Sequence, residues 1–226
     1  MLRIIVFLGP SLDQASAAKI LAAEYRPLAK RGDILVAVAD GADIIGLIDG
    51  VFHQDCAVAH REILVAVKSG ITVVGASSMG ALRAAEMDTL GMTGIGRIYH
   101  MYKDGTITSD DEVALVFDPV SGYALSEPLI NIRCTLKKAE GAGIITPTAH
   151  AALLGAARSV FYPQRTYPKI AAVAGEAIDA ATKERFLAFA AATPADQKRE
   201  DAIAALEYIR DLAEKSASHH EQQFRE

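Results

Sequence analysis

The stretch ITVVGASSMGALRAAEM, residues 71–87, joins a β-branched apolar run to an alanine-rich segment through two serines. The apolar run is typical of a buried strand, and the segment after it is typical of a helix that begins at the serines. A strand followed directly by a helix is the repeating unit of a parallel sheet covered by helices. The stretch therefore predicts an α/β fold. It leaves the role of Ser77 and Ser78 open between helix capping and chemistry.

The first 120 residues repeat this alternation. We predict a helix over residues 14–30, another over 55–69, and strands at 4–8, 34–39, 45–48 and 71–74. Such a pattern predicts a mostly parallel, Rossmann-like sheet with helices on both faces. Functional groups gather beyond the carboxyl ends of the strands in these sheets. We therefore expect residues 9–13, 49–53 and 76–80 to converge.

The second half of the chain has mainly helical patterns. Three pairs resemble a helix cap followed by an early proline: Ser126 with Pro128, Thr146 with Pro147, and Thr193 with Pro194. We predict a last helix from residue 196 to about 215 and a polar tail from about 216. The predicted organisation is an α/β core over residues 1–125 and a helical C-terminal portion over 126–226 that packs on the core.

Composition excludes several classes of function. The 226 residues are 51% hydrophobic and carry a net charge of −5, so the chain has no basic footprint for nucleic acid. Its two cysteines form no CxxC pattern, which favours a reducing cytoplasm. No apolar run approaches the roughly 20 residues of a membrane helix. We also expect no metal and no cofactor, because neither a zinc-ligand spacing nor a complete nucleotide-binding motif is present.

Residues 76–80, ASSMG, fit the small-x-nucleophile-x-small pattern of a nucleophile elbow. That turn places a hydroxyl at a helix N-terminus, where backbone N–H groups stabilise a developing oxyanion. On this spacing Ser78 is the candidate nucleophile, and Ser77 is the cap or an oxyanion donor. Their roles are exchangeable, because residues 75–77 also supply small neighbours. The alternative is that both serines only cap the helix.

A serine nucleophile needs a base. His60 is the candidate histidine because we expect it on the apolar stripe of the helix over residues 55–69. Asp49 follows a predicted strand and could orient an imidazole or take the proton itself. The structural alternatives are a hydrogen-bonded core histidine for His60 and a turn former for Asp49.

Four further residues are candidates for supporting roles. Arg83 and Glu86 stand three apart on a helix, which suits an intrahelical ion pair, a carboxylate-binding group or a brace for the serine-bearing helix. Ser11 lies in the GPSL turn, whose N–H groups could cradle an anion. Glu112 ends an acidic cluster that could supply a general acid or a cation ligand, although acidic helix starts are common.

Several motifs together resemble one known family, the TfuA-like proteins. They are VFLGPSL at residues 6–12, IDGVF at 48–52, AVAHREIL at 57–64, GASSMGALRAAE at 75–86 and GTITSDDEVAL at 105–115. The resemblance covers roughly residues 4–135, and the 75–86 motif is the most specific.

The resemblance implies a partner and a role. TfuA-like proteins occur with YcaO-type enzymes in forming thioamides on ribosomal peptides and on methyl-coenzyme M reductase, where they are implicated in supplying or coupling the sulfur. A sulfur-carrier protein with a C-terminal thiocarboxylate is an acyl–sulfur compound, so releasing sulfide from it is acyl transfer to water, which suits a serine nucleophile. The expectation is a hydrolase that releases sulfide beside a YcaO-type enzyme. The alternative is a non-catalytic adaptor that activates that enzyme.

Overall fold

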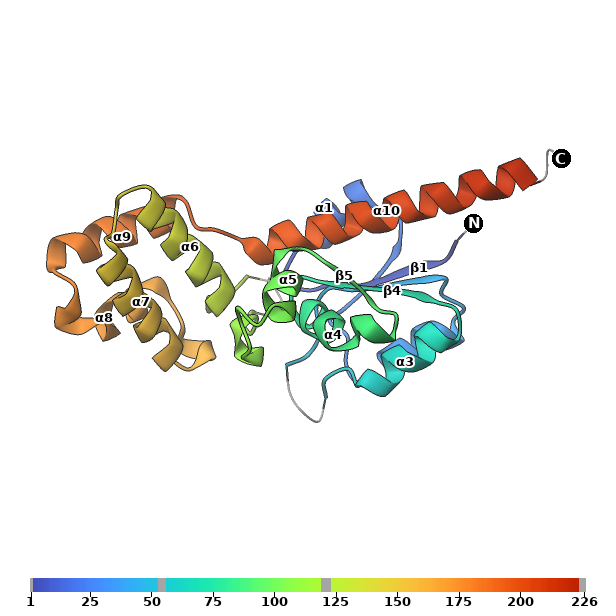
Figure 1. The fold of residues 1–226 in the computed structure, drawn as a ribbon, viewed down its shortest axis with the longest axis horizontal. Helices are drawn as coiled ribbons and strands as arrows, with labels where there is room; N and C mark the ends of the chain where they lie inside the picture. The colour runs from blue at the N-terminus through green and yellow to red at the C-terminus, as the bar shows by residue number, and fades with distance from the viewer. Residues whose placement is uncertain (1, 53–55, 119–122, 224–226) are drawn as a thin grey trace. The chain divides into compact units, whose positions relative to one another are not determined.

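The computed structural model describes residues 2–52, 56–118 and 123–223. Within them the chain forms a five-stranded sheet in the order β2-β1-β3-β4-β5, and every neighbouring pair is parallel (Figure 1). The strands are β1 (Ile4–Phe7), β2 (Glu24–Arg26), β3 (Ile44–Leu47), β4 (Thr72–Ala76) and β5 (Thr93–Ile95). This order reverses between β1 and β3, so the loops after these two strands flank a topological switch point, where α/β sheets bind ligands.

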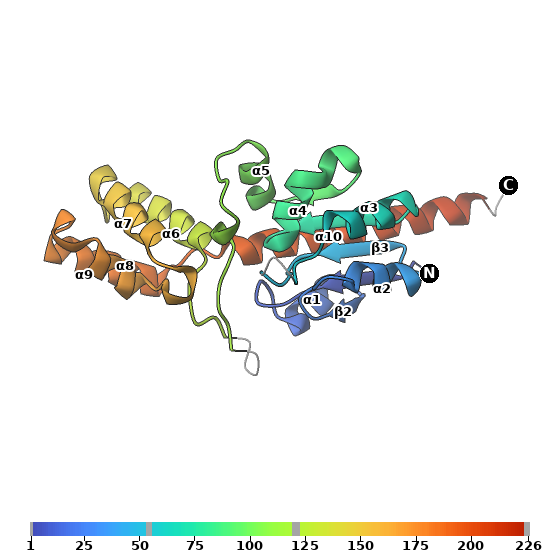
Figure 2. The ribbon, with the colours of Figure 1, turned by 90° about the horizontal axis from the view of Figure 1, so that it is seen from below.

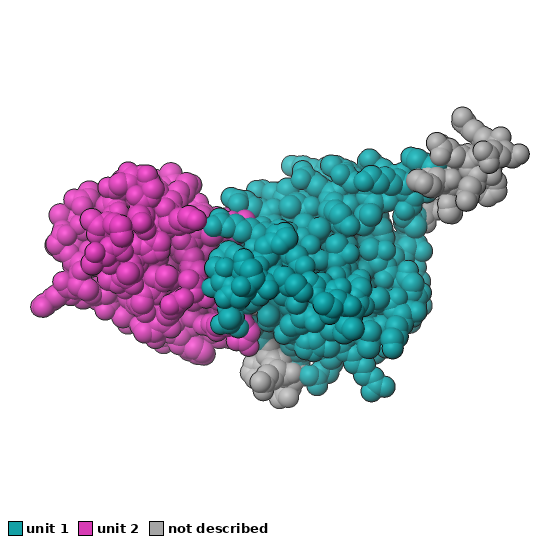
Figure 3. All heavy atoms as spheres, in the orientation of Figure 1, with its two compact units in different colours: residues 1–108, 198–226 teal, residues 109–197 magenta. Residues whose placement is uncertain are grey.

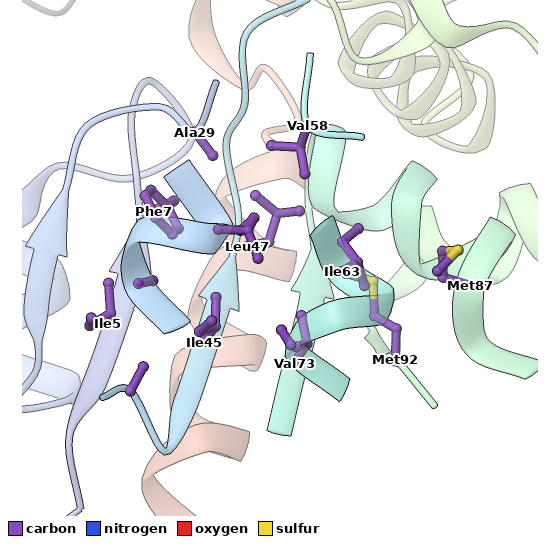
Figure 4. Close-up of a cluster of buried hydrophobic side chains, with 14 of the residues drawn as sticks. Ile5, Phe7, Ala29, Ile45, Leu47, Val58, Ile63, Val73, Met87 and Met92 are labelled. Carbon is purple, nitrogen blue, oxygen red and sulfur yellow. The ribbon is translucent and has the colours of Figure 1, made fainter. Parts of the chain in front are cut away.

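Helices cover both faces of the sheet. On one face, α2, α3 and α4 pack over Ile5, Phe7, Ile45, Leu47 and Val73 (Figure 4). On the other, α10 packs over Ile4, Val6, Ile44, Ile48 and Val74. Figure 1 shows the sheet between α10 and the layer that contains α3 and α4, and in Figure 2, seen from below, α10 runs behind the sheet. Because alternate strand residues are buried on opposite faces, β1 and β3 are apolar along their whole length. The helices of this region are α1 (Gln14–Ile20), α2 (Asp33–Ala39), α3 (His60–Lys68), α4 (Met79–Met87), α5 (Arg97–Lys103) and α10 (Gln197–Gln223), with a 3₁₀ turn η1 (Asp88–Leu90).

The chain divides into two compact units, coloured separately in Figure 3. Unit 1 comprises residues 1–108 and 198–226 and contains the sheet, and unit 2 comprises residues 109–197. Unit 2 is helical, with a core that includes Leu136, Leu153, Ile170 and Phe186. Its elements are η2 (Asp110–Glu112), α6 (Leu129–Gly141), α7 (Pro147–Ser159), η3 (Tyr162–Gln164), α8 (Tyr167–Val173), η4 (Gly175–Ala177) and α9 (Ala180–Ala192). No helix in the described ranges has the length and apolar character that crossing a membrane requires.

The α/β class, the parallel sheet and the mainly helical C-terminal part are confirmed. Two predicted elements are wrong. Residues 34–39 lie in α2 rather than in a strand, because a short apolar run fits a buried helix as well as a buried strand. The helix predicted over residues 14–30 ends at Ile20, and β2 follows. Pro27 explains part of this, since it drives the residue before it into extended conformation.

The segment boundaries differ in detail from those expected. Pro128 caps α6 and Thr146 caps α7, but Thr193 ends α9 instead of starting a helix. Helix α10 continues to Gln223, past the predicted end near residue 215, and it packs on the sheet of unit 1. The division into 1–125 and 126–226 stays a prediction about domains.

The start of α4 lies directly against the backbone of β3. A Cβ atom added at Gly80 would stand 1.7 Å from the Leu47 carbonyl oxygen, and the Gly80 N–H donates to the Ile48 carbonyl at 3.3 Å. At Gly75 an added Cβ would stand 2.3 Å from the Gly80 carbonyl oxygen. The two glycines therefore let the turn between β4 and α4 sit tightly on the carboxyl end of the sheet.

We expect Gly80→Ala to destabilise the protein by about 1–3 kcal/mol or more, because the new methyl meets backbone that cannot move aside. The matched control is Gly155→Ala in α7, where an added Cβ meets nothing within 4 Å. That change is expected to stabilise the protein by about 0.5–1 kcal/mol through helix propensity. Urea unfolding measures both, and equal stabilities for the two variants would contradict the close approach.

Unit 2 contains a carboxyl group in an unfavourable setting. Burial, and secondarily the carboxylate of Asp196, raise the pKa of Glu127 above its ordinary value. Folding therefore favours the protonated form. The protein therefore loses stability as pH rises from the pKa of Glu127 in the unfolded state to its higher pKa in the folded state.

Glu127→Gln is accordingly expected to raise stability at pH 7, and the gain should disappear below about pH 4, where the wild-type carboxyl is protonated in both states. The exposed Glu176→Gln change is the control and should alter stability little at either pH. Thermal unfolding from pH 4 to pH 8 checks the prediction. A gain from Glu127→Gln that is the same at both ends of that range would refute it.

Candidate active site

The turn between β4 and α4 is strained. Ser77 has a φ of 66°, a left-handed conformation that non-glycine residues rarely adopt. The Ser78 N–H donates to the Ala76 carbonyl at 2.8 Å, which closes a γ-turn around Ser77. A γ-turn with positive φ is rare and strained, and such strain clusters at functional sites. The strained serine of the elbow is thus Ser77, whereas the spacing favoured Ser78.

The Ser77 hydroxyl belongs to a chain of buried hydrogen bonds. Ser77 Oγ donates to Ser11 Oγ at 2.9 Å, and Ser11 Oγ donates to Asp49 Oδ1 at 2.6 Å. The direction is dictated by chemistry, because an ionised carboxylate only accepts and Ser11 must therefore receive its other bond from Ser77. The loops after β1 and β3 and the turn after β4 thus meet, as the strand topology leads one to expect.

Asp49 is 1% exposed and fully engaged by the loop after β1. Its Oδ2 accepts from the N–H groups of Gly9 at 2.9 Å and Ser11 at 3.0 Å. The anion cradle expected in the GPSL turn is therefore present, but the carboxylate of Asp49 occupies it.

Lys198 reaches the same carboxylate from the first turn of α10, and the sequence reasoning missed it. Its Nζ lies 3.8 Å from Asp49 Oδ1, and its side chain is 3% exposed. No local pattern indicates this role, because Lys198 lies in a charged segment that resembles any helix start. The one signal that could have indicated a buried role is that this lysine is flanked by the core positions of an amphipathic helix.

Ser78 is the N-cap of α4 and differs from Ser77 in its bonding. Its side chain makes no capping hydrogen bond in the described structure, so the helix is not capped by this hydroxyl. Its carbonyl accepts from the N–H groups of Ala81 and Leu82. Ser78 is 7% exposed and Ser77 is 0% exposed, so of the two serines only Ser78 retains surface.

His60 is placed differently from the expectation. It is the first residue of α3, and its side chain is 53% exposed instead of lying on a buried stripe. The reason is that α3 begins at His60, so the core-facing positions start at Glu62 and Ile63. Residues 53–55, which the predicted convergence and the predicted helix include, lie outside the described residues.

Arg83, Glu86 and His60 form their own cluster. Arg83 Nη1 and His60 Nε2 each lie 2.7 Å from Glu86 Oε2, and Arg83 Nε donates to the Val58 carbonyl at 2.9 Å. The ion pair considered for Arg83 and Glu86 is thus present. Glu86 follows Ser78 by eight residues, which is about 12 Å along a helix axis. The cluster therefore joins α4 to α3 and its preceding loop, and the structure does not bring His60 to a serine.

Glu112 belongs to unit 2. It is 2% exposed and receives two hydrogen bonds from Arg133, at 2.8 and 2.6 Å. This bidentate pair joins η2 to α6, so the observed contact of Glu112 is architectural. Within the part of the chain that the structure describes, no group of three or more histidine, cysteine or acidic residues is arranged to hold a metal ion.

The strain at Ser77 is testable without any substrate. We expect Ser77→Gly to be more stable than Ser77→Ala by about 1 kcal/mol, since glycine adopts positive φ without the steric cost of a Cβ. At Ser159, the last residue of α7, glycine should bring no such advantage over alanine, because helical backbone favours alanine. Urea unfolding of the four variants measures both differences, and an Ser77→Ala variant as stable as Ser77→Gly would argue against a left-handed Ser77.

The comparisons with known proteins agree with the motif resemblance. No curated protein matches the chain. The family model described as "TfuA-like protein" matches residues 49–166, which cover Asp49, both serines of the elbow and most of unit 2. That match spans more than half of the chain, and the protein therefore belongs to the TfuA-like family.

Proposed function

We propose that this protein hydrolyses the C-terminal thiocarboxylate of a small sulfur-carrier protein and releases sulfide to a YcaO-type enzyme that forms peptide thioamides. Membership of the TfuA-like family supports a role in thioamide-forming systems. The observation that carries the hydrolase assignment is the chain from Ser77 through Ser11 to Asp49, on a strained strand-to-helix turn. A serine whose proton is already directed towards a buried carboxylate is arranged for nucleophilic attack.

Ser77 is the nucleophile in this proposal. Its Oγ attacks the thiocarboxylate carbon, its proton moves to Ser11 Oγ, and the Ser11 proton moves to Asp49 Oδ1. Collapse of the tetrahedral intermediate breaks the carbon–sulfur bond, and the sulfur leaves as hydrosulfide after taking up that proton. Water then attacks the acyl-serine, one of its protons restores the Ser77 hydroxyl, and the other is released to solvent as the carrier carboxylate forms.

The turn also offers a donor for the oxyanion. The N–H groups of Ser78 and Gly80 are engaged by the carbonyls of Ala76 and Ile48. Met79 is the first residue of α4, where the N–H has no intrahelical partner by geometry. Its N–H and the positive end of the helix dipole would stabilise the negative charge that develops during acyl transfer. Ser78, which retains surface, would contact the incoming C-terminus.

One observation favours the alternative class of function. Ser77 has no exposed surface, so a substrate reaches it only if the turn or its covering side chains move. A protein that only binds and activates a YcaO-type enzyme needs no such opening. The adaptor is therefore retained as the second candidate. In either case the expected location is the cytoplasm, where thiol chemistry stays reduced.

The deciding measurement is sulfide release from a thiocarboxylated carrier, with melting temperature recorded for each variant. Ser77→Ala should lower the rate by about 10³-fold or more, because it removes the attacking oxygen. Ser78→Ala should reduce it far less. Ser69→Ala, at an exposed serine ending α3, is the control and should leave the rate unchanged.

Two outcomes would change the assignment. If Ser78→Ala abolishes release and Ser77→Ala does not, the nucleophile is Ser78. If wild-type protein releases no sulfide yet stimulates thioamidation with free sulfide, the adaptor function is correct. His60→Gln tests the remaining prediction, and a loss as large as that of Ser77→Ala would return His60 to the proton path.

A further inference from the structure

We infer that Lys198 is a positioning residue that compensates the buried charge of Asp49 and keeps its carboxylate directed at Ser11, so that the first turn of α10 forms part of the candidate site. This inference rests on the proposed function and extends it to a residue outside the family-matched region 49–166.

The contacts of the Asp49 carboxylate carry the argument. Lys198 Nζ approaches Oδ1, the same oxygen that accepts from Ser11 Oγ. The other donors are the uncharged N–H groups of Gly9 and Ser11. Among the described residues, Lys198 thus supplies the charged contact of Asp49, from α10. The loop after β1 supplies its neutral donors, and the turn after β4 reaches it through Ser11.

The charge of Lys198 matters because both it and Asp49 are buried. The side chains of Asp49 and Lys198 are 1% and 3% exposed, and a buried carboxylate is costly unless a cation and hydrogen-bond donors compensate it. A protonated Asp49 would donate from its O–H group. If the proton is on Oδ1, Ser11 Oγ must accept a hydrogen bond from Asp49 instead of donating one. The hydrogen bonds then no longer run from Ser77 through Ser11 to the carboxylate. The ammonium of Lys198 attracts the Oδ1 atom that accepts from Ser11, and so supports the observed direction of the chain.

Helix α10 is held in place by other contacts. Ala202, Ala205, Leu206 and Ile209 pack into the apolar cluster on one face of the sheet. Asp201 Oδ2 accepts from the Ile98 N–H at 2.7 Å and lies against Gly96, where a Cβ would be 2.6 Å from that oxygen. Because these contacts dock the helix, the buried charge of Lys198 is not needed for docking alone. Its position on the Asp49 oxygen is better explained by the site.

The test compares Lys198→Met, which keeps an unbranched side chain one atom shorter and removes the charge, with Lys198→Arg, which keeps a charge. Lys215→Met, on the exposed part of the same helix, is the control. Sulfide release is measured from pH 5 to pH 9. We expect Lys198→Met to move the acid limb of the rate profile to higher pH by about 1 unit or more, and Lys198→Arg to restore part of that shift. Lys215→Met should follow the wild type.

A stability cycle makes the inference independent of activity. Lys198→Met, Asp49→Asn and the double variant are unfolded in urea at pH 7, and the midpoint lost through Lys198→Met should be smaller when Asp49 is already neutral. An equal loss in both backgrounds overturns the inference, whatever the activity. An unchanged acid limb in an active Lys198→Met protein also overturns it. A coupled pair in a wild-type protein that releases no sulfide defeats the hydrolase assignment and upholds the pairing.

Discussion

A buried carboxylate at the switch point of the sheet organises the candidate site. Asp49 follows β3 and lies between neighbouring strands, so its two oxygens reach the loop after β1 on one side and, through Ser11, the turn after β4 on the other. Burying a charge is costly unless donors surround it, and here N–H groups, a hydroxyl and the ammonium of Lys198 do so. The carboxylate has its hydrogen-bond partners only when these segments come together. The burial of Asp49 therefore also fixes the positions of Ser11 and Ser77.

The second constraint is the tight contact between α4 and β3. Gly75 and Gly80 leave no room for a side chain, and this contact forces the turn between them to be short. A short turn from a strand into a helix is what places Ser77 in the left-handed region. The strain is therefore sustained by packing across the sheet, and the hydrogen bond from Ser77 to Ser11 gives the strained side chain a defined direction.

Much of the fold was accessible from local pattern. The β-branched runs of β1, β3 and β4 and the glycines and serines after β4 predict a parallel α/β sheet, and the sheet has that form. Residues 34–39 were misassigned because six apolar residues carry no period that separates a buried strand from a buried helix. The short strand β2 was missed for the opposite reason. Its residues Glu24 and Arg26 are partly exposed at the sheet edge, so they have no apolar run to reveal them.

The sequence by itself determined that Ser77, Ser78, Asp49 and Ser11 stand at strand ends, because hydrophobic period and turn chemistry are local properties. The tertiary structure decided which of them touch. Which serine faces Ser11 depends on the φ of a single residue, and that angle depends on how closely α4 packs on β3. The presence of Lys198 beside Asp49 depends on α10 returning to the sheet after the whole of unit 2. Pattern cannot supply such contacts, because side chains far apart in the chain meet only when the core between them has formed.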